Sequence, residues 1–271
     1  MAADAKMVKT RKTKVRAIVI RAAGTNCNIE TARAFELAGA TAEQVHINEL
    51  ISGKKKLDDC HILAVPGGFS YGDDLGSGKI FANQLSIKLG QQLRRFVEHG
   101  KLAIGICNGF QVLIKLGLLP ALEGIFAQEA TLTSNDSGKF EDRWVYLKAE
   151  NDSIFTKGIK KLYLPVNHAE GKFVADSKVV EELNRCRLVK LKYVDERGSE
   201  KAPYPGNPNG SQMNIAAITN KQGNVFGMMP HPEKFVEKHT HPRWTREQLP
   251  DEGDGLRIFR NMVEYAEEEL M

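Results

Sequence analysis

The feature that most constrains the fold of this chain is the segment 102–117, LAIGICNGFQVLIKLG, in which an apolar run changes its period. LAIGI is typical of a strand that is buried on both faces, and NGFQVLIKLG is typical of a helix. A strand that turns sharply into a helix pushes the residue at the turn out above the sheet. That residue is Cys107, and Gly105 and Gly109 leave room for a strained turn and for close helix packing.

Strands and helices alternate through the rest of the N-terminal half. We expect strands at 15–20, around 45–47 and at 61–65, a helix capped by Asn26 or Asn28 that ends at Gly39, and a helix over 79–99. This order predicts an α/β fold with a mostly parallel central sheet and helices on both faces. Ligands of such sheets bind at the carboxyl ends of the strands, where PGGFSYGDD (66–74) and CNG (107–109) lie.

After residue 125 the pattern changes to short strands separated by polar loops. We expect these strands to extend the same core, so that residues 15–271 form a single domain. The Pro- and Gly-rich stretch 200–213 is a predicted loop, and 254–270 is a predicted closing helix. The expected short strands are 130–133, 143–148, 162–166, 188–194, 214–219 and 224–229.

Charge and hydropathy exclude several classes of protein. The net charge is +4, but residues 1–16 hold six Lys or Arg and one Asp and thus contribute +5. We expect residues 1–14 to be a basic, disordered tail, because no aromatic residues are interleaved to stack on bases. No nucleic-acid partner is therefore expected. The chain also lacks a long apolar stretch or an apolar signal core, so we expect no membrane association and a cytoplasmic location.

The four cysteines are widely scattered and include no CxxC pair, which argues against a zinc site or a disulfide framework. Cys60 and Cys186 are expected to be structural thiols, whereas Cys27, at a predicted helix start, stays ambiguous. The spacing of His231, His239 and His241 matches no usual ligand pattern. We expect no metal site.

Cys107 is the candidate nucleophile, because the N-terminus of a helix favours the thiolate. The alternative is a buried structural cysteine whose neighbouring glycines serve only the turn. Acyl transfer also needs donors for an oxyanion, and the backbone N–H of Asn108 and the loop Gly67-Gly68-Phe69 can supply them. Gln111 lies one helical turn after Cys107 and could bind a polar substrate.

A nucleophilic cysteine also needs a base and a group that orients the base. His231 and Glu233 stand two residues apart and point the same way in an extended strand. His168 and Glu170 have identical spacing, so spacing alone does not choose between the two pairs.

With these residues in place, the chain resembles class I glutamine amidotransferases, in which Cys, His and Glu act in this chain order. PGGFSYGDD, GICNGFQVLIKLGLLP, NDSGKFEDRWV, PVNHAEGKF, YPGNPNGS and GNVFGMMPHPE together resemble the glutaminase components of phosphoribosylformylglycinamidine synthases, over about residues 15–265. The resemblance implies Cys107 as nucleophile, His231 as base and Glu233 as its partner. It further implies an oxyanion hole and a substrate pocket, with the residues Gly68, Phe69, Asn108, Gln111 and His168.

The resemblance also implies a reaction and a partner. Cys107 would attack the side-chain amide of L-glutamine, and the ammonia would pass to a synthetase subunit that converts formylglycinamide ribonucleotide in purine synthesis. ATP and Mg are expected on that subunit, with no cofactor on this chain, and a small bridging subunit is a further expected partner. Two departures stand out, namely Gly76 where many members carry Arg, and a long segment 234–253 that we expect to be a surface insertion.

Two alternatives remain open at this point. The chain could be an amidotransferase that serves another synthetase. It could also be a noncatalytic or redox-sensing module on an α/β elbow scaffold.

Overall fold

The computed structural model describes residues 14–271. The predicted basic tail therefore lies outside the described residues, apart from Lys14. The α-helices are α1 (Asn28–Leu37), α2 (Ile47–Ile51), α3 (Lys79–Glu98), α4 (Asn108–Lys115), α5 (Ser177–Arg185) and α6 (Leu256–Glu269). The strands are β1 (Arg16–Arg21), β2 (Thr41–His46), β3 (Ile62–Val65), β4 (Leu102–Ile106), β5 (Ala130–Thr133), β6 (Glu141–Ala149), β7 (Lys161–His168), β8 (Lys172–Ala175), β9 (Val189–Val194), β10 (Ile215–Thr219) and β11 (Val225–Met228).

One large mixed sheet organises the molecule, in the order β2-β1-β3-β4-β11-β10-β9-β6-β7. The strands from β2 to β11 pair in parallel, whereas those from β11 to β7 pair antiparallel. The predicted mostly parallel sheet thus describes the half that carries the elbow. The remaining strands β5 and β8 form a separate antiparallel pair.

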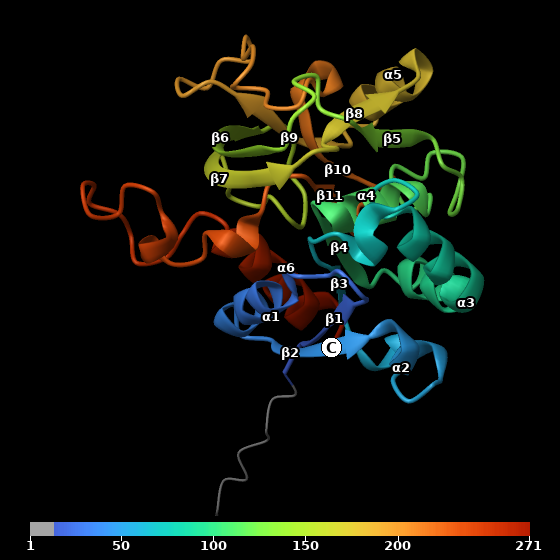
Figure 1. Ribbon diagram of the computed structural model, residues 1–271. Coiled ribbons are helices and arrows are strands. Elements are labelled where there is room, and N and C mark those ends of the chain that lie inside the picture. The colour runs from blue at the N-terminus through green and yellow to red at the C-terminus, as the bar shows by residue number, and fades with distance from the viewer. Residues whose placement is uncertain (1–13) are drawn as a thin grey trace, which may run out of the picture.

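Helices cover both faces of the parallel half. Figure 1 shows α1 and α6 on one side of β1, β3 and β4, and α3 and α4 on the other. The burial pattern explains this sandwich, because every residue of β3 and β4 is buried, as a strand covered on both faces requires. Within residues 14–271, no helix is long and apolar enough to cross a membrane.

Some predicted local features differ from the structure. The N-cap position of α1 is Cys27, whose side chain makes no capping hydrogen bond, and not Asn26 or Asn28. Asn26 instead accepts a hydrogen bond from the Cys27 thiol, and Asn28 is already the first helical residue. Helices α2 and α5 and strand β8 were not predicted. All three are short, and α5 has only one buried residue, Leu183.

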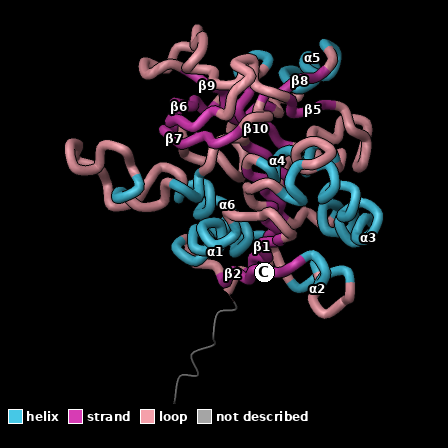
Figure 2. The backbone as a smooth tube through the Cα atoms, in the orientation of Figure 1, coloured by secondary structure: helices cyan, strands magenta, loops and turns pink. Residues whose placement is uncertain are grey.

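The segment 234–253 leaves the sheet and projects to one side, where Figures 1 and 2 show it as a long excursion next to β7. It is nevertheless anchored. Trp144 of β6 packs edge-on against Phe235 and His241, with ring centroids 5.3 and 5.4 Å apart. The predicted surface insertion is therefore a folded segment with an aromatic attachment to the sheet.

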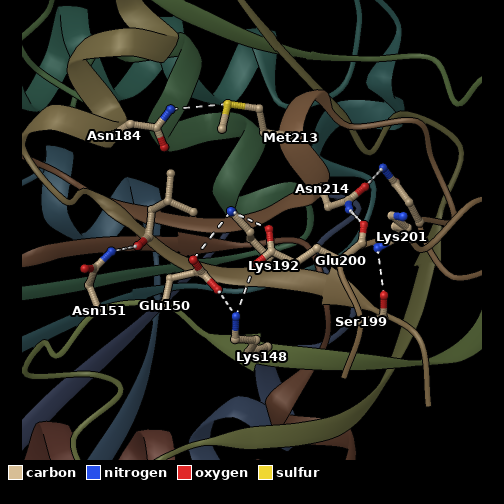
Figure 3. A network of polar contacts seen from close by, with 12 residues as sticks. Lys148, Glu150, Asn151, Asn184, Lys192, Ser199, Glu200, Lys201, Met213 and Asn214 are labelled. Carbon is tan, nitrogen blue, oxygen red and sulfur yellow. Dashed lines mark hydrogen bonds and ion pairs between the residues drawn. The ribbon is translucent and has the colours of Figure 1, made fainter. Parts of the chain in front are cut away.

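A network of charged side chains fastens the loop that follows β9 (Figure 3). Lys192 and Lys148 both contact the carboxylate of Glu200, at 2.8 and 3.1 Å, and both contact Glu150 as well. Asn214 donates a hydrogen bond to the backbone carbonyl of Glu200 at 2.6 Å. One end of the 200–213 loop is thus fixed to β6 and β9 and is joined to the other end. This loop also carries Asn209, which contacts His168.

Candidate active site

The sharp turn predicted at Cys107 is present. Cys107 follows β4 directly, caps α4 and has a positive φ of 52°, a conformation that non-glycine residues rarely adopt. Both flanking glycines are required by packing. A Cβ on Gly109 would stand 1.7 Å from the carbonyl oxygen of Val65, and one on Gly105 would stand 2.6 Å from that of Gly109. The glycines therefore allow α4 to lie directly against β3 and β4.

His231 and Glu233 follow β11, the parallel neighbour of β4, so both arrive at the carboxyl edge where Cys107 lies. Nδ1 of His231 lies 2.6 Å from Oε1 of Glu233, and both side chains are buried. Burial lowers the pKa of His231, but the Glu233 carboxylate and the Cys107 sulfur outweigh it, so the pKa of the imidazole is raised well above its usual value. The pair thus favours an imidazolium beside the cysteine.

The rival pair, His168 and Glu170, is arranged differently. The ring of His168 is held on both sides, by Asn135 at 3.1 Å from Nδ1 and by Asn209 of the 200–213 loop at 3.4 Å from Nε2. Burial and, to a smaller extent, the nearby His231 lower the pKa of His168 to about 4. A neutral ring with both nitrogens engaged suits a wall of the site better than a base.

A cavity of about 220 Å³ opens beside the sulfur of Cys107. Its size suits a small molecule such as an amino acid. The predicted residues Gly68, Phe69, Gln111 and His168 are among those that line it. The complete lining is Gly68, Phe69, Asp73, Ser77, Cys107, Gln111, Asn167, His168, Ala169 and Glu170.

Two backbone N–H groups are free to face an oxyanion. Asn108 is the first residue of α4, so its N–H has no partner within the helix. No hydrogen bond within residues 14–271 takes the N–H of Gly68, whereas the N–H of Phe69 donates to Gly24. The structure therefore narrows the predicted donors to Asn108 and Gly68, with Phe69 contributing its ring. Gly67 stands behind them, because a Cβ there would lie 2.8 Å from the His231 ring.

The side chain of Gln111 is already engaged. It donates to the carbonyl of Glu170 at 2.6 Å and accepts from Asn108 at 3.0 Å. Asn108 in turn donates to Asp73 and accepts from the backbone of Ser70. These amides therefore tie α4 to the two loops that form the pocket walls.

Two carboxylates in the pocket were not assigned a role from the sequence. Burial raises the pKa of Asp73, and the nearby charge of Glu170 raises it further, although hydrogen bonds from Gly78, Ser77 and Asn108 lower it. Glu170 was noticed only as a partner for His168, and it instead accepts a hydrogen bond from Ser77. The only sequence signal that Asp73 lies in the pocket is its position within PGGFSYGDD, at the end of a strand.

A lysine lies close to Gly76, the position at which Arg was expected from the resemblance. A Cβ at this position would lie 3.6 Å from Nζ of Lys115, which itself donates to the carbonyl of Ser77. A cation thus stands next to Gly76, where the resemblance led us to expect Arg.

Comparisons with known proteins agree with this geometry. The model of the CobB/CobQ-like glutamine amidotransferase domain matches residues 14–266. Phosphoribosylformylglycinamidine synthase subunit PurQ of Dehalococcoides mccartyi is 50% identical over 258 residues, covering 94% of this chain and 98% of that one. The PurQ subunit of Methanococcus maripaludis is 43% identical over 268 residues, with the same coverage. Among solved structures, a chain of PurLQS from Thermotoga maritima matches with a TM-score of 0.72 and 33% identity, covering 93% of this chain and 99% of that one.

A family model that spans nearly the whole described chain, on a fold with a cysteine elbow, defines the class: the chain belongs to the CobB/CobQ-like glutamine amidotransferases. This confirms the predicted fold class. More narrowly, it belongs to the family of phosphoribosylformylglycinamidine synthase subunits named PurQ, which confirms the resemblance drawn from the sequence motifs.

Proposed function

We propose that this chain is the glutaminase subunit of a phosphoribosylformylglycinamidine synthase and hydrolyses L-glutamine to glutamate and ammonia. The observation that carries the proposal is the convergence of Cys107 on its strained turn with the buried pair of His231 and Glu233 at one edge of the sheet. Relatives that are 50% and 43% identical to the chain are named as subunits of this synthase. Their names support this synthase over an amidotransferase that serves another synthetase.

Each catalytic residue has a separate task. The sulfur of Cys107 attacks the carboxamide carbon, and the N–H groups of Asn108 and Gly68 bind the oxygen that becomes negative. His231 receives the thiol proton and passes it to the departing nitrogen, which leaves as ammonia. It then takes a proton from water, which attacks the thioester and releases glutamate. Glu233 holds the Nδ1 proton and stabilises the imidazolium.

The pocket carboxylates suggest why the substrate is free glutamine. Asp73 and Glu170 both line the cavity, and each can attract the α-ammonium group of the free amino acid. A glutamine within a peptide has no such charge. We therefore assign Asp73 and Glu170 to recognition of the substrate ammonium group.

Ammonia is useful only if a partner captures it. A synthetase subunit is the partner, in keeping with the chain of PurLQS that this chain resembles, and we expect ATP, Mg and a small bridging subunit on the partner side. Phe69 and Phe140 form an aromatic pair, 44% and 48% exposed, next to the pocket. We propose that the synthetase covers this pair and completes the site. The expected location of the assembly is the cytoplasm.

The test is glutamate release by the chain assembled with its synthetase. Cys107→Ser is expected to abolish glutamate release and leave the fold intact. Cys186→Ser changes a half-buried thiol and should retain glutamate release. Full activity of Cys107→Ser would refute the proposal. Substrate-independent, reversible oxidation of Cys107 without glutamate release would favour the redox-sensing alternative.

A further inference from the structure

Cys27, which the sequence left ambiguous, lies next to the buried side chains of His231 and Glu233. Its backbone N–H donates to the carbonyl of Gly67 at 3.2 Å, and its own carbonyl accepts hydrogen bonds from the backbone and the hydroxyl of Thr31. These bonds fix the start of α1 against the loop after β3. The thiol is buried, so its position is set by packing and not by solvent.

The fold brings this thiol to the base of the proposed triad. Cys27, His231 and Glu233 each offer a ligand atom, and these atoms all lie within 4.8 Å of one another. It is the one such group of three among residues 14–271. A Cβ on Gly67 would meet both the His231 ring, at 2.8 Å, and the sulfur of Cys27, at 3.3 Å, so the two side chains border the same small space.

A second observation concerns the atoms of His231 and Glu233 that their mutual hydrogen bond leaves free. Nε2 of His231 and Oε2 of Glu233 are buried and have no hydrogen-bond partner in the described structure. Both side chains are less than 3% exposed. Buried polar atoms are rarely left without a partner, and these two are the kinds of atom that bind metal ions.

We propose that Cys27, His231 and Glu233 form a binding site for a thiophilic divalent cation, with Zn²⁺ as the fitting ion. Sulfur, nitrogen and oxygen ligands at usual zinc distances stand about 3 to 4 Å apart, so small side-chain rotations close the set. Binding replaces the thiol proton of Cys27 and one ring proton of the His231 imidazolium, and both protons are released to solvent. Mg²⁺ is a poor fit, because it prefers oxygen ligands in octahedral geometry.

Occupation of this site would inhibit the proposed glutaminase, and this consequence rests on the proposed function. The base needs one ring nitrogen for the proton of Cys107 and the other for Glu233. A metal on either nitrogen removes one of these roles. The nucleophile itself need not be a ligand, which separates this site from simple capture of zinc by Cys107.

The test is zinc binding by the full chain, measured in competition with a chromogenic chelator and without glutamine. Cys107→Ser should still bind one equivalent of Zn²⁺, and Co²⁺ bound there should show sulfur-to-cobalt charge-transfer absorption. Adding Cys27→Ser should weaken zinc binding by more than about tenfold and remove that absorption. Serine is a good N-cap residue, so the Cys27→Ser change should not disturb the start of α1. The matched control is the double variant with Cys107→Ser and Cys186→Ser, which should bind Zn²⁺ like Cys107→Ser alone.

Two results would overturn the site. One is equal zinc affinity with and without Cys27, and the other is loss of zinc binding in Cys107→Ser, which would place the ion on the nucleophile. Glu233→Gln tests a second ligand independently if the Cys27 variant fails to fold. Because binding is measured without substrate, failure of the zinc site and failure of glutamine hydrolysis give separate results.

Discussion

Nδ1 of His231 and Oε1 of Glu233 lie 2.6 Å apart, and both side chains are buried. The carboxylate can accept only from a protonated Nδ1, so Nε2 is left as the nitrogen available to the cysteine. Two residues that are separated in sequence by a single proline thus set the tautomer on which the proposed reaction depends.

Replacing Glu233 by Gln should therefore impair the reaction much more than the fold. Gln presents an amide that can hold the wrong tautomer and cannot stabilise the imidazolium. We expect kcat for glutamate release to fall by about 10² to 10⁴-fold, as it does in other enzymes whose catalytic histidine is oriented by a carboxylate. Steady-state kinetics of the complex with its synthetase measure this. Glu237→Gln, which alters an exposed ion pair with Arg33, is the control, and a Glu233→Gln enzyme within twofold of wild type would contradict the assignment.

The elbow makes a prediction about stability. Gly109→Ala places a methyl group 1.7 Å from the backbone oxygen of Val65, and the backbone cannot rotate away as a side chain can. We expect the free energy of unfolding to fall by about 3 kcal/mol, at the upper end of usual overpacking costs. Gly90→Ala in α3 is the matched control, because its nearest neighbour would be the Phe126 ring at 3.7 Å. Urea unfolding that finds equal stabilities for the two variants would show that the close packing is not required.

Much of this elbow was predictable, because it is encoded locally. The period change at 102–117, the glycines on either side of Cys107 and the mostly apolar strand predicted at 61–65 all depend on residues near in sequence. The structure has these elements close to the predicted bounds. Strand β8 and helix α5 were missed, because they are short and have few buried residues to mark their period.

The contacts within the site were less predictable, because they join segments far apart in the chain. Spacing could not separate His231 from His168, and only the fold shows that the ring of His168 is held by Asn135 and Asn209. The placement of Cys27 against His231 likewise depends on how the segments that follow β1, β3 and β11 come together at the carboxyl edge of the sheet. No local pattern in GTNCN reports it.

The buried neutral ring of His168 should make stability depend on pH. Its pKa is lowered to about 4 in the folded chain, against about 6.5 when unfolded. Above pH 6.5 both states are neutral and the contribution is fully present; as the pH falls from 6.5 towards 4, the unfolded state binds a proton first and stability is lost. Each pKa unit corresponds to 1.36 kcal/mol, so up to about 3 kcal/mol is lost.

The measurement is the free energy of unfolding at pH 7 and at pH 4.5. Wild type should lose about 2 kcal/mol more over this interval than His168→Gln, which has no ring to protonate. His99→Gln, a change at an exposed histidine, should behave like wild type. Equal losses in wild type and His168→Gln would show that His168 is not held neutral by burial.

The pocket carboxylates predict a change in substrate preference. Glu170→Gln should raise KM for glutamine by about 10- to 100-fold, since a charged hydrogen bond contributes roughly 1.5 to 3 kcal/mol. The KM for the glutamine analogue that lacks the α-amino group should change little, because that analogue offers no ammonium. Asp74→Asn, a change at an exposed neighbour of Asp73, is the control. An equal effect of Glu170→Gln on both substrates would argue for a structural role.

The central claim is that Cys107 forms the covalent intermediate, and rapid quenching tests it most directly. The complex of this chain with its synthetase is mixed with glutamine, quenched in acid and digested, and the peptides are analysed by mass spectrometry. We predict a glutamyl adduct on the peptide that contains Cys107, and none on the peptide that contains Cys27. Turnover of glutamine with no adduct on Cys107, or with the adduct on Cys27, would contradict the account.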